Sequence, residues 1–307
     1  MSIHPSMLPL LDPEYVAHHN SNYAHLPALD SMAWDPAIRE NFNMQPDFAT
    51  LPVEKTEDFE LDLTRLRAYT PSGEPPEGGW PALLYIHGGG WTLGNISSEA
   101  PLMTNICASV RCVVVAVDYR LAPEDPYPAA VNDCVAALLW LVRQGPQKLH
   151  INPARIAVGG TSSGGNLAAV LALKASTLQI PKLILQVLIV PITDNTATVA
   201  TSWESKKYAP FLTPDVMMWF RHHYLPDPET WTNWDASPLF ATADQIRALP
   251  KTLFILSECD ILCEEAEQYA KKIKREGVDV EVKIYKGAPH NGVLHESTCV
   301  GLSQNLS

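Results

Sequence analysis

RIAVGGTSSGGNLAAVLAL, residues 155–173, joins an apolar run, a glycine- and serine-rich turn, and a run rich in alanine and leucine. The pattern predicts a buried strand, a sharp turn and a helix. The turn contains the motif G-x-S-x-G with Ser162 at its centre. A serine at such a turn sits in strained backbone with its hydroxyl raised above the sheet edge, so we predict that Ser162 is a nucleophile. A plain glycine-rich turn that binds phosphate is the alternative.

Apolar runs separated by helical stretches continue on both sides of this segment. The runs lie at 82–86, 112–117, 155–158, 183–190, 252–256 and 280–285. Helical patterns cover 129–143 and 264–275, and Gly277 follows the second. Nearly continuous apolar strands alternating with helices predict an α/β fold with a mostly parallel sheet covered on both faces. The alternation of apolar and charged residues at 53–69 predicts two antiparallel strands before it.

Two segments depart from this rhythm. Residues 1–50 are rich in proline, histidine and asparagine, with short amphipathic pieces at 15–19 and 32–42. The stretch 195–249 holds four of the eight tryptophans and a helix start at Thr213-Pro214-Asp215. We predict a catalytic domain at 51–307, with cap segments at 1–50 and at about 195–249. A brief helix at 294–302 is expected to follow the last strand.

Composition excludes several classes of function. The formal charge of −12 argues against nucleic acid as a partner, since phosphate binding needs a surplus of Lys and Arg. No apolar run reaches the roughly 18 residues that a membrane span needs. Residues 1–11 lack a basic segment followed by an apolar one, so we expect no signal peptide and a cytoplasmic protein. The spacing of the cysteines fits no zinc site and predicts reduced structural thiols. They are Cys107, Cys112, Cys134, Cys259, Cys263 and Cys299.

A glycine loop follows the apolar run 82–86. It reads His87-Gly88-Gly89-Gly90-Trp91. Successive glycines let backbone N–H groups face a carbonyl oxygen that is becoming an alkoxide. Three glycines alone could form a flexible loop. Because this loop occurs in the same chain as the Ser162 turn, the two together indicate an active site.

The sequence resembles the hormone-sensitive-lipase-like family of esterases. HGGGW at 87–91, DYRLAPE at 118–124, GGTSSGGN at 159–166 and GAPHNG at 287–292 match its blocks in order, within about residues 50–292. The resemblance implies an α/β-hydrolase fold with a helical cap. It also implies an oxyanion hole at Gly88, Gly89, Gly90 and Ser163, in which Gly88 shapes the turn and the other three donate. His87 is then structural, and Asp118, Arg120 and Glu124 hold loops in place.

The acid and the base are expected to follow Ser162 in the chain, each after a later strand. The strand at 252–256 leads to Asp260, and the strand at 280–285 leads to His290. A histidine accepts the serine proton when a carboxylate fixes its other nitrogen. We therefore predict a triad of Ser162, Asp260 and His290, with Glu258 as the competing acid.

Four positions depart from the family pattern. Thr161 stands where an aspartate is usual, Ser163 where an alanine is usual, Asn291 where an aromatic residue is usual, and Glu264 where an aspartate is common. Neither the change at Thr161 nor the one at Ser163 removes a backbone donor. The four changes bear on the substrate pocket and on the support of His290, not on the fold.

The expected activity is hydrolysis of small to medium acyl esters, without cofactor or metal. The alternatives left open are amide hydrolysis, acyl transfer or cyclisation by the same triad, and a non-catalytic receptor on the same fold. The expected partner is a small-molecule ester, and a homodimer stays open. The predicted pocket residues are Trp34, Phe42, Phe211 and Trp219, with a place in the core of the cap as the alternative for each.

Overall fold

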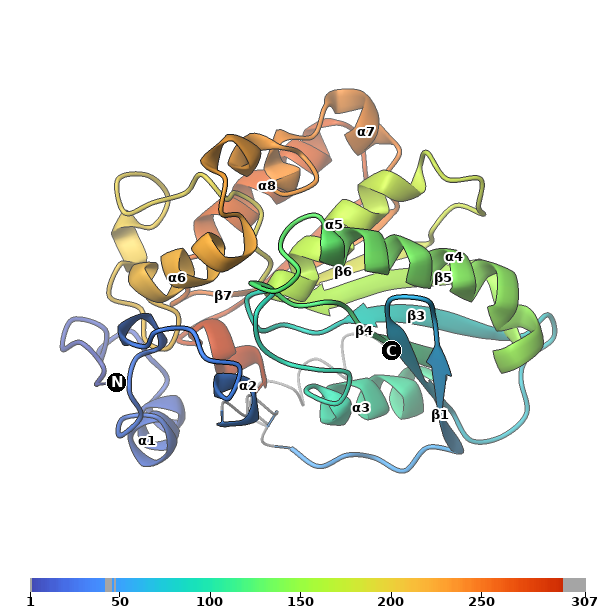
Figure 1. Cartoon of the computed structure of the whole chain (residues 1–307), viewed down its shortest axis with the longest axis horizontal. Coiled ribbons are helices and arrows are strands. Elements are labelled where there is room, and N and C mark those ends of the chain that lie inside the picture. The colour runs from blue at the N-terminus through green and yellow to red at the C-terminus, as the bar shows by residue number, and fades with distance from the viewer. Residues whose placement is uncertain (1, 42–45, 47, 295–307) are drawn as a thin grey trace.

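The computed structural model describes residues 2–41, 46 and 48–294. Its centre is an eight-stranded sheet in the order β1-β2-β4-β3-β5-β6-β7-β8 (Figure 1). β1 and β2 are antiparallel to their neighbours, and all other pairs are parallel. This is the α/β-hydrolase fold with the mostly parallel sheet that the sequence predicted.

Every predicted strand is present. The bounds are Lys55–Glu60 (β1), Arg65–Thr70 (β2), Trp80–Ile86 (β3), Val113–Asp118 (β4), Ile151–Thr161 (β5), Leu185–Ile189 (β6), Lys251–Ser257 (β7) and Val280–Tyr285 (β8). β5 begins before the predicted 155–158 because Ile151 pairs with Trp80 at the start of β3. The predicted pattern marked only the apolar half of this strand.

Both faces of the sheet are buried because successive side chains of a strand point to opposite sides. On β3, Leu84 and Ile86 belong to one apolar cluster, while Leu83 and Tyr85 belong to another. The first cluster also contains buried side chains from the helices α4 (Ala129–Leu149), α5 (Ser163–Ala175) and α8 (Cys263–Arg275). The second is covered by α3 (Ala100–Val110). Figure 1 shows α3 on the side of the sheet opposite α4, α5 and α8.

Helices also form in the two segments predicted to be caps. The first holds α1 (Pro13–Asn22), a 3₁₀ turn η1 (Leu29–Ser31) and α2 (Ile38–Asn41). The second holds η2 (Glu204–Lys206), α6 (Pro214–Tyr224), η3 (Pro228–Thr232), η4 (Pro238–Phe240) and α7 (Ala243–Arg247). The start of α6 follows the predicted signal, since the Thr213 side chain accepts a hydrogen bond from Val216 N and Pro214 opens the helix.

The two segments meet at one end of the sheet, where α1, α2 and α6 lie (Figure 1). Trp219 Nε1 of α6 donates to the Met32 carbonyl, 3.1 Å away, which ties them together. The division into a catalytic domain and caps remains a prediction. A 3₁₀ turn η5 (His290–Leu294) ends the described chain, so most of the helix predicted at 294–302 lies outside the described residues.

The parallel strands place several loops at one sheet edge. Loops after the carboxyl ends of β3, β5, β7 and β8 carry the glycine loop, Ser162, Asp260 and His290 respectively. In open α/β sheets this edge is where ligands bind. Among the described helices, none has the length and apolar character needed to cross a membrane.

Candidate active site

Ser162 stands at the junction of β5 and α5 in a strained conformation. Its φ of 56° lies in the left-handed region, which costs a non-glycine residue about 1–3 kcal/mol. Ser162 N donates to the Ile189 carbonyl at 2.8 Å, which holds the turn on the end of β6. A β-carbon at Gly164 would collide with the carbonyls of Ile86 and His87, so only glycine allows α5 to start this close to β3. The α5 N-terminus thereby points its partial positive charge at the site.

The structure brings the three predicted triad residues into one hydrogen-bonded row. His290 Nε2 lies 2.9 Å from Ser162 Oγ, and His290 Nδ1 lies 2.6 Å from Asp260 Oδ2. Asp260 Oδ1 also accepts from Leu262 N at 3.0 Å, which fixes the carboxylate plane. The ring therefore donates to the carboxylate and offers its free nitrogen to the serine hydroxyl.

Burial shields this row from water. Ser162 is 8% exposed, His290 6% and Asp260 1%. Electrostatic interactions are stronger in such surroundings than in water. The arrangement can deprotonate a hydroxyl as it attacks and can hold the resulting imidazolium against a carboxylate.

Glu258, the competing acid, has a different contact. Its Oε2 accepts from Gly287 N at 2.9 Å, on the loop that leads to His290. Cys259 N donates to the Ala288 carbonyl at 2.9 Å in the same pair of loops. These bonds join the acid loop to the base loop, and Asp260 alone of the two carboxylates hydrogen-bonds to His290.

Helix α1 supports the base loop from the other side. Tyr15 Oη donates to Asn291 Oδ1 at 3.1 Å and lies 3.1 Å from His19 Nδ1. Asp12 N, at the start of α1, donates to the Gly287 carbonyl at 3.0 Å. Sequence reasoning marked Asn291 as a departure from the family but did not find its partner, because no local signal links residues this far apart.

The glycine loop lies beside Ser162. Gly89 and Gly90 adopt φ values of 115° and 59°, and no hydrogen-bond acceptor is recorded for their N–H groups among the described residues. Gly88 differs from them, because its N–H donates to Glu99 Oε1 at 2.7 Å. Of the predicted oxyanion set, the backbone donors that remain for a ligand are therefore Gly89, Gly90 and Ser163. Glu99 is not identified from the sequence as a residue that contacts the glycine loop.

The other family blocks hold loops together. His87 is buried and stacks on Tyr119, with ring centroids 4.4 Å apart, and burial lowers the pKa of its imidazole. Asp118 accepts from Ile96 N at 2.9 Å, and Arg120 pairs with Asp133. Glu124 pairs with Arg39 of the N-terminal segment. These contacts agree with a structural role for His87 and the DYRLAPE block.

A small apolar cavity of about 30 Å³ opens beside Ser162. Its lining is Leu29, Gly89, Gly90, Ser162, Ile192, Phe211, Leu212, Val216, Met217, Phe220 and His290. Of the predicted pocket residues, Phe211 lies here. Trp34 and Trp219 do not line it and instead pack on one another, with ring centroids 6.0 Å apart. Phe42 lies outside the described residues.

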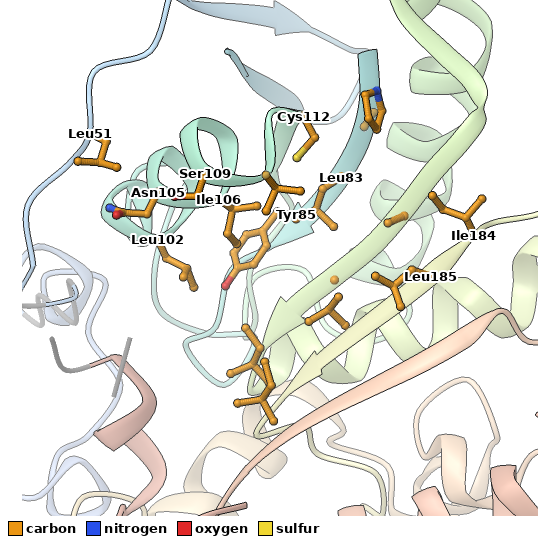
Figure 2. A pocket seen from close by; sticks show the side chains of 18 of the residues that line it. Leu51, Leu83, Tyr85, Leu102, Asn105, Ile106, Ser109, Cys112, Ile184 and Leu185 are labelled. Carbon is orange, nitrogen blue, oxygen red and sulfur yellow. The ribbon is translucent and has the colours of Figure 1, made fainter. Parts of the chain in front are cut away.

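A larger apolar cavity of about 350 Å³ lies on the α3 side of the sheet. Figure 2 shows Leu83 and Tyr85 of β3, Leu102 and Ile106 of α3, and Leu185 of β6 around it. None of the triad residues lines it. It is therefore separate from the site at Ser162.

No group of three or more His, Cys, Asp or Glu side chains in the described part of the chain could hold a metal ion. The chemistry available at the site is that of a hydroxyl nucleophile, an imidazole base and backbone N–H donors.

Comparisons with known proteins agree with this arrangement. Residues 83–294 match a family described as α/β-hydrolase fold. An AB hydrolase superfamily protein of Schizosaccharomyces pombe is 44% identical over 295 residues, covering 91% of this chain and 86% of that protein. The carboxylic ester hydrolase LipN of Mycobacterium tuberculosis is 35% identical and is matched over 76% of this chain but 65% of its own length.

Solved structures give the same result. A hyperthermophilic esterase from the archaeon Pyrobaculum calidifontis superposes with a TM-score of 0.86 at 32% identity, and the match covers 97% of each chain. The likeness thus includes the cap segments as well as the sheet.

Proposed function

The chain belongs to the α/β-hydrolase fold family, and on that premise we propose that it hydrolyses carboxylic esters through an acyl-enzyme formed on Ser162. The observation that carries the proposal is the hydrogen-bonded row from Ser162 Oγ through His290 to Asp260. A receptor that had lost catalysis would have no need of this row.

In the first half-reaction, Ser162 Oγ attacks the ester carbonyl carbon while His290 Nε2 takes the hydroxyl proton. The carbonyl oxygen becomes an oxyanion, which the N–H groups of Gly89, Gly90 and Ser163 stabilise. Asp260 stabilises the imidazolium. His290 then gives its proton to the leaving alcohol oxygen, and the C–O bond breaks to leave the acyl group on Ser162.

In the second half-reaction, water attacks the acyl carbon and His290 takes one of its protons. The tetrahedral intermediate collapses, Ser162 Oγ leaves with the proton from His290, and the carboxylic acid is released. No cofactor enters either step.

The acyl group is expected to be short. Support comes from the small cavity beside Ser162, whose walls Leu212, Met217 and Phe220 are buried and apolar. A narrow apolar cavity of this kind favours short acyl chains over long ones. The names of relatives, such as carboxylic ester hydrolase and esterase, agree with carboxylic esters as the class of substrate.

Replacement of the nucleophile tests the proposal. Ser162→Ala is expected to lower kcat for p-nitrophenyl acetate by about 10⁴-fold or more, as the loss of a triad nucleophile does elsewhere. Ser257→Ala is the control, because Ser257 is buried at the end of β7 and its hydroxyl has no partner among the described residues. A fluorophosphonate probe is expected to label the wild type and the control but not Ser162→Ala. Equal turnover by all three proteins would reject the assignment.

Product analysis separates hydrolysis from acyl transfer by the same triad. With p-nitrophenyl acetate in water that contains a competing alcohol, hydrolysis yields mainly acetate. A predominance of the new acetate ester would instead favour acyl transfer.

A further inference from the structure

A buried carboxyl group lies directly beneath the glycine loop. It belongs to Glu99, which precedes α3 and is 4% exposed. Its Oε1 accepts from Gly88 N at 2.7 Å. Gly88 immediately precedes Gly89 and Gly90, which line the cavity beside Ser162, so this bond fixes the start of the loop.

The second oxygen of Glu99 extends the contact to the nucleophile turn. Oε2 accepts a short hydrogen bond from Tyr85 Oη of β3. Tyr85 Oη also lies 2.7 Å from Thr161 Oγ1, and Thr161 directly precedes Ser162. The Tyr85 ring itself lines the cavity on the α3 side (Figure 2). One carboxyl group thus connects the loop of the oxyanion donors to the turn of the nucleophile.

The packing around Gly88 shows how little room there is. A β-carbon added there would lie 3.1 Å from the Thr161 carbonyl and 3.2 Å from Glu99 Oε1. The loop backbone is therefore held between the nucleophile turn on one side and the Glu99 carboxyl on the other. A shift of Glu99 would move the loop relative to Ser162.

Among the described residues, Glu99 has no cationic partner to offset the burial of its carboxyl group. No Lys, Arg or His nitrogen within the described ranges forms an ion pair with it, and burial raises the pKa of its carboxyl group. A buried polar group of this kind is costly for stability unless its hydrogen bonds repay the cost. Groups with such perturbed acidity gather at functional sites.

We propose that Glu99 is a positioning residue for ester hydrolysis, which holds Gly88 so that the N–H groups of Gly89 and Gly90 converge on the developing oxyanion. The inference rests on the proposed function and deepens it. Thr161, which stands where the family usually has an aspartate, contacts Glu99 through Tyr85. The carboxyl group in this chain thus comes from the segment before α3 and not from the nucleophile turn.

The test separates the stabilisation of the transition state from the binding of the substrate. Glu99→Ala removes the acceptor for Gly88 N–H. Glu99→Gln keeps a carbonyl oxygen for Gly88, and its NH₂ group can donate to Tyr85 Oη. Glu265→Gln is the matched control, because Glu265 is a second buried glutamate (1% exposed) that accepts from Thr193 N, Asp194 N and Trp203 Nε1.

For each variant, kcat per fluorophosphonate-titrated site, KM for p-nitrophenyl acetate and Ki for a trifluoromethyl ketone are measured. The ketone forms an oxyanion on Ser162 and so reports on the donors. Glu99→Ala is expected to lower kcat about 10- to 100-fold, less than or equal to the loss of a whole oxyanion donor, and to raise Ki in parallel. KM is expected to change less than threefold. Glu99→Gln is expected to recover kcat to within about threefold of the wild type, and Glu265→Gln to stay within about twofold.

A merely structural role for Glu99 would reduce the titrated fraction without changing kcat per site, and that result would overturn the inference. If Glu99→Ala does not fold, Tyr85→Phe takes its place. That change removes only one hydroxyl and is expected to lower kcat and raise Ki about three- to tenfold together, so unchanged values would also overturn it. A wild type that matches Ser162→Ala in turnover would reject the proposed esterase activity instead.

Discussion

The backbone of Ser162 is strained because two demands meet at one residue. Its N–H must pair with Ile189 on β6, while its hydroxyl must rise toward His290 from the start of α5. A φ of 56° satisfies both, at a cost of about 1–3 kcal/mol. Glycines on each side of the turn let α5 and β3 come close enough to hold it there. The Ser162 hydroxyl is thus positioned by the fold itself.

Met217 is expected to limit acyl length, since its side chain is buried and lines the cavity beside Ser162. Met217→Ala is predicted to raise kcat/KM for p-nitrophenyl hexanoate relative to the acetate by roughly tenfold, because a pocket discriminates about 1–3 kcal/mol per methylene. A panel of esters from acetate to decanoate measures the shift.

Met103→Ala provides the control for that panel. Met103 is equally buried but lies in the α3-side cluster, away from Ser162. Its variant is expected to lose stability while it keeps the chain-length profile of the wild type. Identical profiles for Met217→Ala and the wild type would contradict the assigned role.

Some residues of the site have a local signal in the sequence, and others do not. Ser162, Asp260, His290 and the glycine loop could be predicted because each follows an apolar strand and matches a short motif. Their meeting in space is now visible, although their catalytic roles remain proposals. Glu99 could not be found in the same way. It lies in a polar stretch without a motif, and its importance comes from its contacts with Tyr85 of β3 and Gly88 of the glycine loop.

At the scale of elements, α1 is a clear example of a partly correct prediction. The sequence indicated a short amphipathic piece at 15–19 within a predicted cap segment, and α1 forms there and contacts the loop that carries His290. What it covers could not be derived, since the hydrogen bond from Tyr15 to Asn291 spans 276 residues. Helix propensity and capping are local properties, whereas docking is not.

Tyr15→Phe tests how much α1 contributes to the base loop. The change leaves Asn291 Oδ1 without its donor, which is expected to lower the free energy of unfolding by about 1–3 kcal/mol. Urea denaturation measures this loss. Tyr208→Phe is the control, because Tyr208 is half exposed and its change is expected to cost less than about 0.5 kcal/mol. Equal midpoints for the two variants would show that the bond to Asn291 adds nothing to stability.

Helix α3 is not predicted from the sequence. Its first turns bury Pro101, Leu102, Met103 and Thr104 in succession, so it has no simple one-sided apolar stripe. Glu99 precedes it as the N-cap but makes no side-chain capping bond. The carboxyl group that would have marked the helix start is turned instead toward Gly88.

At the scale of the whole molecule, the fold was predictable because its signals repeat. All six apolar runs and the two antiparallel strands form as strands of one sheet. The order of the strands was less accessible, since β3 lies between β4 and β5 and is not next to β2. Pairing of this kind depends on contacts between distant segments, which apolar periodicity does not record.

The stability of the molecule is expected to depend on pH through Glu265. Burial raises the pKa of this carboxyl group from 4.5 to about 8. Between these values the unfolded chain loses the proton that the folded chain keeps, so the free energy of unfolding falls as pH rises. Each pKa unit corresponds to about 1.4 kcal/mol. Below pH 4.5 both states keep the proton, so the free energy of unfolding is highest there and no longer changes with pH through this group, and above about pH 8 both states have lost it.

Glu265→Gln removes this titration while it keeps the shape of the side chain. Urea unfolding at pH 5.5, 6.5 and 7.5 is predicted to show that the variant gains stability relative to the wild type as pH rises. Parallel pH profiles for the two proteins would contradict the raised pKa.

The contact between Tyr15 and Asn291 also has a consequence for the order in which a ribosome delivers this protein. Tyr15 emerges 276 residues before Asn291, so α1 lacks this hydrogen-bond partner through nearly all of translation. A nascent chain halted before β8 would carry Ser162 and the glycine loop but neither His290 nor Asn291. The hydrogen-bonded row of Ser162, His290 and Asp260 is therefore completed only late in synthesis.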